Sequence, residues 1–243
     1  VLDGFVIQGG NAAGITADYH TWRGGGIYNY GSAPTIANCI IRDNRAQVSG
    51  GGIANEVAPY GNGDAQIVNC VIHDNHANRQ ADGGVGPNGG NPIRGGGGIF
   101  NNQSSPTINL DTIYANTIDT TYVGDDMHHG ELSGGIYTWR ATPTVANSIV
   151  WANTGGIRHE RSHPDTVDQL GNPIPDGGDP PTQNTTATYS DIQMVSGVYP
   201  GTGNINALPN FSGAAPFPYQ ITGAPCLNTG SSAITEDIRL VPR

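Results

Sequence analysis

The sequence predicts an all-β solenoid, in which short strands follow one another around successive coils. Three observations support this: one two-part unit recurs along the chain, glycine and asparagine occupy fixed places in it, and residues that favour helices are scarce. Glycine makes up 37 of the 243 residues, about twice its usual share of roughly 7 %. Lysine is absent, and only 12 % of the residues are charged. This composition favours strands joined by Gly, Pro and Asn turns.

The recurring unit has a glycine-rich half and a strand half. The glycine-rich halves lie at 24–29, 50–55, 96–101 and 134–137, and the strand halves at 34–44, 66–75, 106–116 and 143–153. Each strand half ends at an asparagine: Asn44, Asn75, Asn116 and Asn153, which lie 31, 41 and 37 residues apart. A constant unit with variable spacing is typical of a solenoid whose loops differ in length.

The expected elements follow in chain order. Residues 1–11 align with a strand half, so the chain starts in the middle of a coil. Further coils are expected at 24–44, 50–75, 95–116 and 134–153, and the strand pattern resumes at 187–193. Polar segments predict insertion loops at about 78–94, 117–133 and 158–186. We therefore expect a single domain over 1–243, belonging to a longer or stacked assembly.

Stacking of equivalent residues predicts lengthwise columns of like side chains. The four asparagines that end the strand halves should form a structural ladder, in which side-chain amides bond from coil to coil. Asparagine also tolerates the left-handed backbone that a turn requires. Cys39 and Cys70 are equivalent in successive repeats, about 4.8 Å apart. Two buried free thiols and a disulfide between them both stay open.

The charge of the chain limits its partners. The formal net charge is −10 at pH 7, whereas phosphate binding needs a basic surface, so a nucleic-acid ligand is not expected. No stretch approaches 18 apolar residues, so no membrane span is expected. An acidic surface is compatible with cation binding.

The repeat resembles a known family. The glycine-rich segment 24–29 with 34–44 is similar to the secreted right-handed parallel β-helix proteins of the pectin-lyase-like superfamily, and most similar to the bacterial group with polymorphic-outer-membrane-protein-type repeats. Segments 189–193, 203–205 and 224–226 resemble the terminal coils of that group. The resemblance implies a right-handed parallel β-helix of about six or seven coils and a secreted or cell-surface, bacterial-type location. Members of the group include surface proteins, adhesins and carbohydrate-active enzymes.

Enzymes of this fold mostly act on acidic polysaccharides, by elimination or hydrolysis, so two loops carry candidate residues. Asp125, Asp126 and Glu131 could bind Ca²⁺ through their carboxylates, although no recognised metal motif is present and no cofactor is required. Arg158, His159, Glu160 and Asp165 could supply the cation, base and acid of a lyase. A solvated acidic or mixed-charge loop explains either group equally well.

A third candidate is a column on one strand of each coil. Arg42, His73, Tyr114 and Trp151 occupy equivalent places, which predicts an exposed column where aromatic rings and cations could bind a sugar chain. Ordinary exposed strand residues would give the same pattern.

The function that the sequence favours is a non-enzymatic extracellular structural or adhesive module. Strands at the ends of a solenoid need partners, so we expect end-to-end self-association or continuation into further domains. The alternative is a lyase or glycoside hydrolase of acidic polysaccharides with its site near the loops at 117–133 and 158–186.

Overall fold

A computed structural model describes residues 1–14, 19–78, 95–119, 133–160 and 185–213. Over these ranges the chain consists of short strands joined by turns, with one 3-10 turn, η1 (Tyr19–Trp22). Short β-branched runs that end at Gly or Asn do not continue as helices, which explains this composition.

The strands belong to four sheets, which we call A to D. Sheet A contains β1 (Leu2–Asp3), β5 (Thr35–Ala37), β9 (Gln66–Val68), β13 (Thr107–Asn109), β17 (Thr144–Ala146) and β20 (Thr186–Thr188). Sheet B contains β2 (Val6–Gln8), β6 (Ile40–Arg42), β10 (Val71–His73), β14 (Thr112–Tyr114), β18 (Ile149–Trp151) and β21 (Asp191–Ile192). Sheet C contains β3 (Asn11–Ala12), β7 (Arg45–Ala46), β11 (His76–Ala77) and β15 (Thr117–Ile118). Sheet D contains β4 (Ile27–Tyr30), β8 (Ile53–Glu56), β12 (Ile99–Asn102), β16 (Ile136–Trp139) and β19 (Ile157–Glu160).

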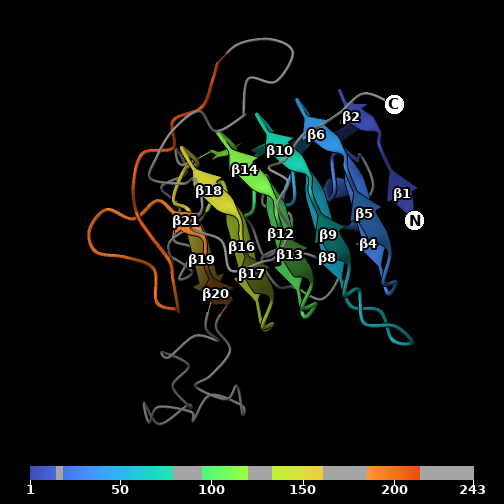
Figure 1. The fold of residues 1–243 in the computed structure, drawn as a ribbon. Coiled ribbons are helices and arrows are strands. Elements are labelled where there is room, and N and C mark those ends of the chain that lie inside the picture. The colour runs from blue at the N-terminus through green and yellow to red at the C-terminus, as the bar shows by residue number, and fades with distance from the viewer. Residues whose placement is uncertain (15–18, 79–94, 120–132, 161–184, 214–243) are drawn as a thin grey trace, which may run out of the picture.

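The chain visits the sheets in turn, and each circuit is one coil. Coil 1 runs from β1 to β4, coil 2 from β5 to β8, coil 3 from β9 to β12, coil 4 from β13 to β16, coil 5 from β17 to β19, and coil 6 contains β20 and β21. All named strand pairs are parallel, and each strand pairs with its equivalents in the neighbouring coils (Figure 1). The molecule is a right-handed parallel β-helix, as the sequence predicts.

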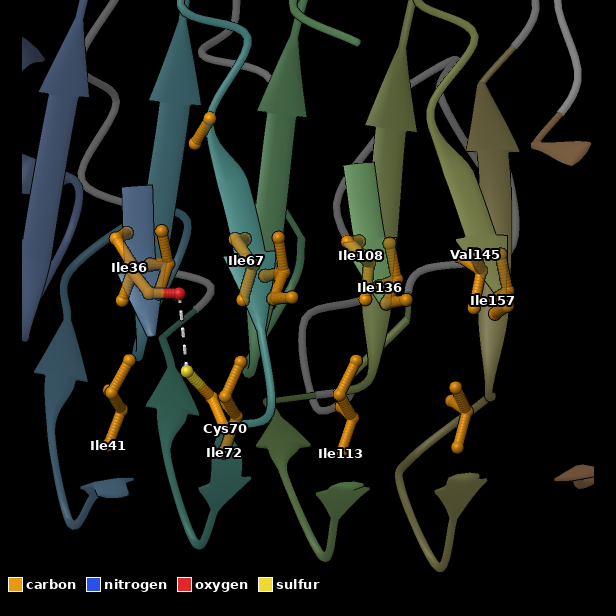
Figure 2. Close-up of a cluster of buried hydrophobic side chains, with 14 of the residues drawn as sticks. Ile36, Ile41, Ile67, Cys70, Ile72, Ile108, Ile113, Ile136, Val145 and Ile157 are labelled. Carbon is orange, nitrogen blue, oxygen red and sulfur yellow. Dashed lines mark hydrogen bonds between the residues drawn. The ribbon is translucent and has the colours of Figure 1, made fainter. Parts of the chain in front are cut away.

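The core is filled by columns of aliphatic side chains that run along the solenoid axis. One column comes from sheet A (Ile36, Ile67, Ile108, Val145), one from sheet B (Ile41, Ile72, Ile113, Val150) and one from sheet D (Ile53, Ile99, Ile136, Ile157) (Figure 2). β-branched side chains stack well on themselves because successive coils are in register. The alternation of side chains along a strand then sends the neighbouring residues to the outer face.

Residues in the left-handed region form two of the corners. At the corner between sheets A and B they are Asn38, Asn69, Leu110, Asn147 and Tyr189, with φ from 49° to 63°. At the corner between sheets B and C they are Asp43, Asp74, Ala115 and Ala152. The expectation that the ladder asparagines themselves supply this conformation is wrong, because the residue before each of them does so.

The glycine-rich halves lie where backbone passes close to backbone. Gly50 has φ 67°, and a Cβ atom on Gly51 would lie 2.5 Å from the His76 carbonyl oxygen. No side chain fits there without moving the neighbouring coil. The repeated glycines therefore allow the segments that join sheets C and D to stack in register from one coil to the next.

Strands occupy the first residues of two expected loops. Thr117–Ile118 form β15, and Ile157–Glu160 form β19, which pairs with β16. Cys39 and Cys70 are both free thiols and both buried, so the first of the two alternatives holds.

Candidate functional site

The outer face of sheet D carries a cluster of hydrogen-bonded polar and aromatic side chains. The register places Tyr30, Glu56, Asn102 and Trp139 in one outward column across coils 1 to 4. A second outward column contains Tyr28, Ala54, Phe100 and Tyr137. Residues that are 20 to 50 positions apart in sequence thus become neighbours.

The carboxylate of Glu56 is the centre of this cluster. Its Oε1 accepts hydrogen bonds from Arg23 Nη1 (2.7 Å) and from Asn102 Nδ2, and its Oε2 accepts one from the Tyr28 hydroxyl (2.8 Å). Arg23 and Glu56 are both about 5 % exposed. An ion pair removed from water needs such additional hydrogen bonds to be tolerated, because its desolvation is costly.

His20 extends this network to the surface. Its Nδ1 bonds the Tyr28 hydroxyl and lies 3.8 Å from Glu56 Oε2, and 29 % of its side chain is exposed. The single Tyr28 proton is directed to Glu56, so His20 Nδ1 must be the donor to the Tyr28 oxygen. The cluster therefore fixes the tautomer and orientation of an accessible imidazole.

Aromatic rings surround the polar groups. The Arg23 guanidinium lies 5.2 Å from the Phe100 ring centroid, and Phe100 stacks on Tyr137. The His20 and Tyr30 ring centroids are 4.8 Å apart, and Tyr30 is 42 % exposed. Three coils further along, Arg140 lies 4.5 Å from the Trp139 ring centroid. A fixed carboxylate, a cation and exposed rings lie close enough together to offer a ligand both hydrogen bonds and ring contacts.

The sequence analysis did not single out this cluster. Arg23 and Glu56 lie 33 residues apart and belong to no motif. One signal was available: Tyr30, Glu56, Asn102 and Trp139 each close the strand that follows a glycine-rich half. The missing information was the register, which only the stacked coils supply.

The expected column on sheet B exists, but its members differ in environment. Strand register aligns Arg42, His73, Tyr114 and Trp151. His73 is only 8 % exposed and bonds Asp74 Oδ2 at 2.7 Å, so the expectation that it is exposed is wrong. The Phe211 ring packs edge-on against Tyr114 at 5.2 Å. The C-terminal described segment therefore covers part of this column.

The predicted loop residues are divided between two places. Arg158 and His159 are neighbours on β19, so they point to opposite faces. His159 Nε2 accepts the Thr185 N–H and lies 3.2 Å from the Tyr199 hydroxyl. Glu160 ends the same strand. Asp125, Asp126, Glu131 and Asp165 lie outside the described residues.

Asparagine side chains link the coils at the corner between sheets B and C. The amides of Asn44, Asn75, Asn116 and Asn153 bond in series, with Nδ2 to Oδ1 distances of 3.0, 3.0 and 2.9 Å. Each Nδ2 also donates to a carbonyl of the preceding coil, as Asn75 does to Ile41 O at 2.8 Å. Inside sheet D, Asn29, Asn55, Asn101 and Thr138 form a second series. Buried polar groups are thus satisfied along the axis.

A third series lies at the corner between sheets A and B and combines different residue types. The equivalent positions hold Cys39, Cys70, Asp111, Ser148 and Ser190. Three backbone N–H groups each bond the next side chain of the series: Cys70 N to Asp111 Oδ1 (2.6 Å), Asp111 N to Ser148 Oγ (3.1 Å) and Ser148 N to Ser190 Oγ (3.2 Å). Ser148 and both cysteines also donate to the carbonyl two residues earlier.

Three groups in this third series have shifted pKa values. Burial raises the pKa of the Asp111 carboxyl to about 8, against the opposing hydrogen bond from the Cys70 backbone. The hydrogen bond between the two thiols lowers the pKa of Cys39 and, together with burial, raises that of Cys70. Asp111 Oδ2 finds no hydrogen-bond partner within the described part of the chain.

Comparisons with known proteins return no relative: no protein-family model, no curated protein and no solved structure matches this chain. Within the ranges that the structure describes, no helix is long and apolar enough to cross a membrane. The same ranges contain no group of three or more His, Cys, Asp or Glu side chains placed to hold a metal ion.

Proposed function

We propose that this chain is an extracellular or cell-surface module, of the bacterial type, whose role is structural or adhesive. The observation that carries the proposal is that three polar ladders and three aliphatic columns each run through at least four consecutive coils of the described solenoid. These contacts repeat from coil to coil, so they make a stiff rod rather than a hinged pocket. The family resemblance of the glycine-rich repeat supports the same role.

End-to-end association is part of this proposal. In coil 1, Phe5 and Val6 are 56 % and 55 % exposed. Cys39, which is the equivalent of Phe5 in coil 2, is fully buried. The outer edge of β1 to β4 offers backbone groups and apolar side chains that another coil would cover. That coil can belong to a second copy or to further residues of a longer protein. The proposed role needs no cofactor, and a Ca²⁺ ion bound by Asp125, Asp126 and Glu131 would be accessory to it.

The experiment is electron microscopy of the purified chain, with light scattering on the same sample. We expect rods or filaments with a subunit repeat near the length of the solenoid, and a mass that rises with protein concentration. A monodisperse monomer at all concentrations would contradict end-to-end association. The adhesive role would then depend only on the side chains on the outer faces of the solenoid.

The Glu56 cluster favours a second candidate, a carbohydrate-active enzyme of the pectin-lyase-like kind. A buried carboxylate that bonds Arg23 and Tyr28, with His20 beside them, could hold or protonate a sugar. The test is a screen of acidic polysaccharides for unsaturated or reducing products, with and without Ca²⁺. Turnover that is lost in Glu56→Gln, with an unchanged circular dichroism spectrum, would establish this candidate. If Glu56→Gln left product formation unchanged, the Glu56 cluster would not be the active site.

A further inference from the structure

We propose that Cys39 and Cys70 form a paired modification site, which a small disulfide such as oxidised glutathione converts into a covalent link between coils 2 and 3. The inference is independent of the proposed function. It begins with register: Ile40 pairs with Val71, and Val71 N donates to Cys39 O at 2.9 Å. The two cysteines are therefore direct neighbours on adjacent coils.

The separation of the two residues suits a disulfide. Neighbouring parallel strands lie about 4.8 Å apart, and disulfides join Cα atoms that are roughly 4.4–6.8 Å apart. Both side chains are fully buried at the same interior corner. The two cysteines hold equivalent corner positions of adjacent coils, and each thiol donates to backbone carbonyls at that corner.

The Cys70 sulfur already leans toward the coil that holds Cys39. Its thiol reaches the carbonyl oxygen of Ile36 in coil 2 at 3.5 Å, in addition to Val68 O in its own coil at 3.4 Å (Figure 2). Cys39 leans in the same way toward Leu2 O of coil 1, at 3.8 Å. Formation of the disulfide therefore requires one of the two cysteine side chains to rotate about χ1 and leave its carbonyl partner.

The surroundings make Cys39 the attacking thiol. It packs against coil 1, where Leu2 and Ile7 are only partly buried, and the neighbouring Cys70 lowers the pKa of its thiol. The Cys39 thiolate attacks one sulfur of oxidised glutathione, which gives a mixed disulfide and one glutathione thiol. The Cys70 thiolate then attacks the Cys39 sulfur and displaces the second glutathione. Two cysteines are oxidised, one glutathione disulfide is reduced, and the two cysteine protons end on the two glutathione thiols.

The test uses the full chain with Cys226→Ser, so that only this pair can react. The protein is treated with excess oxidised glutathione both while folded and during refolding from denaturant, which ensures that burial does not prevent access. Thiols are then alkylated in denaturant, and intact mass and peptide maps are recorded. We expect no alkylation, the loss of two hydrogen atoms, a peptide pair linked through positions 39 and 70, and reversal by dithiothreitol. The link should raise Tm by roughly 5–10 °C, because it closes a loop of about 30 residues in the unfolded chain.

The matched control is Cys39→Ser in the same background. Serine occupies the equivalent position in coils 5 and 6, as Ser148 and Ser190, so this variant should fold. Its Tm should not respond to oxidised glutathione. Two thiols that remain alkylated after oxidative refolding would overturn the proposal, as would a glutathione adduct that Cys70 does not displace.

Discussion

One interior corner position decides much of the chemistry at the scale of single residues. The position holds Cys39, Cys70, Asp111, Ser148 and Ser190 in coils 2 to 6, and each side chain there accepts or approaches a backbone N–H of the preceding coil. Thiols and hydroxyls can both donate and accept. Asp111 is the exception, since a carboxylate only accepts and its charge is removed from water.

Asp111 should make the stability depend on pH. Its pKa is about 8 when folded and near 3.8 when unfolded, so between these values the folded state holds the extra proton. The free energy of unfolding should therefore fall as pH rises from about 4 to about 8, by about 1.4 kcal/mol per pH unit at most, and level off above. Asp111→Ser, which reproduces coils 5 and 6, should flatten this slope and stabilise the protein at pH 8. Urea denaturation across this pH range measures it.

The exposed Asp43→Asn serves as the control for that series, and it should keep the slope of the parent protein. A slope that persists unchanged in Asp111→Ser would show that another group is responsible.

The ladders act at the scale of elements, because they tie each strand to the next coil. Asn75 illustrates the arrangement: its Oδ1 accepts from Asn44 N and Nδ2, and its Nδ2 donates to Ile41 O and Asn116 Oδ1. It is fully buried. The ladder therefore satisfies the corner that β-strand bonding between sheets B and C leaves open.

Asn75→Ala should destabilise the protein strongly. The substitution leaves the Asn44 amide groups and the Ile41 carbonyl without their partner in a dry interior, at a cost of roughly 3 kcal/mol. Chemical denaturation measures the loss of unfolding free energy. Asn78→Ala is the matched control, because Asn78 bonds Arg45 at the surface; its effect should stay within about 0.5 kcal/mol. Equal effects of the two variants would contradict a buried ladder.

At the scale of the whole molecule, the proposed end-to-end association depends on the edge strands of coil 1. Solenoid stability is approximately a sum of contacts between neighbouring coils, and among the described residues the strands of coil 1 pair with coil 2 alone. In the proposed assembly, this edge of parallel strands with exposed Phe5 and Val6 is where another coil would pair.

Val6→Lys should therefore reduce association between copies. A lysine on an edge strand opposes pairing, and it costs little folding energy because Val6 is 55 % exposed. Light scattering should show a lower mean mass at the same protein concentration. Gln66→Lys, on the exposed side of the central strand β9, is the control and should associate like the parent chain. Equal association of both variants would place the contact elsewhere.

The solenoid could be predicted from the sequence because it rests on local patterns. Runs such as Ile40–Arg42 and Val71–His73 are short, β-branched and bounded by turn residues, and their recurrence predicts stacking. Cys39 and Cys70 could be predicted as neighbours for the same reason. The burial of His73 could not be predicted, since the equivalent positions in other coils hold Arg, Tyr and Trp. Burial at this position depends on which residues lie over the strand.

The sequence by itself thus determined the repeat, the parallel stacking and the inward aliphatic columns, because coils of one pattern bury their apolar faces only against each other. The tertiary structure alone decided the Glu56 cluster and the environment of Asp111. The cluster joins Arg23, Tyr28, Glu56 and Asn102 from three coils whose separations in sequence are set by loops of unequal length. Such contacts depend on the register between coils and on desolvation, and neither quantity is a property of any single segment.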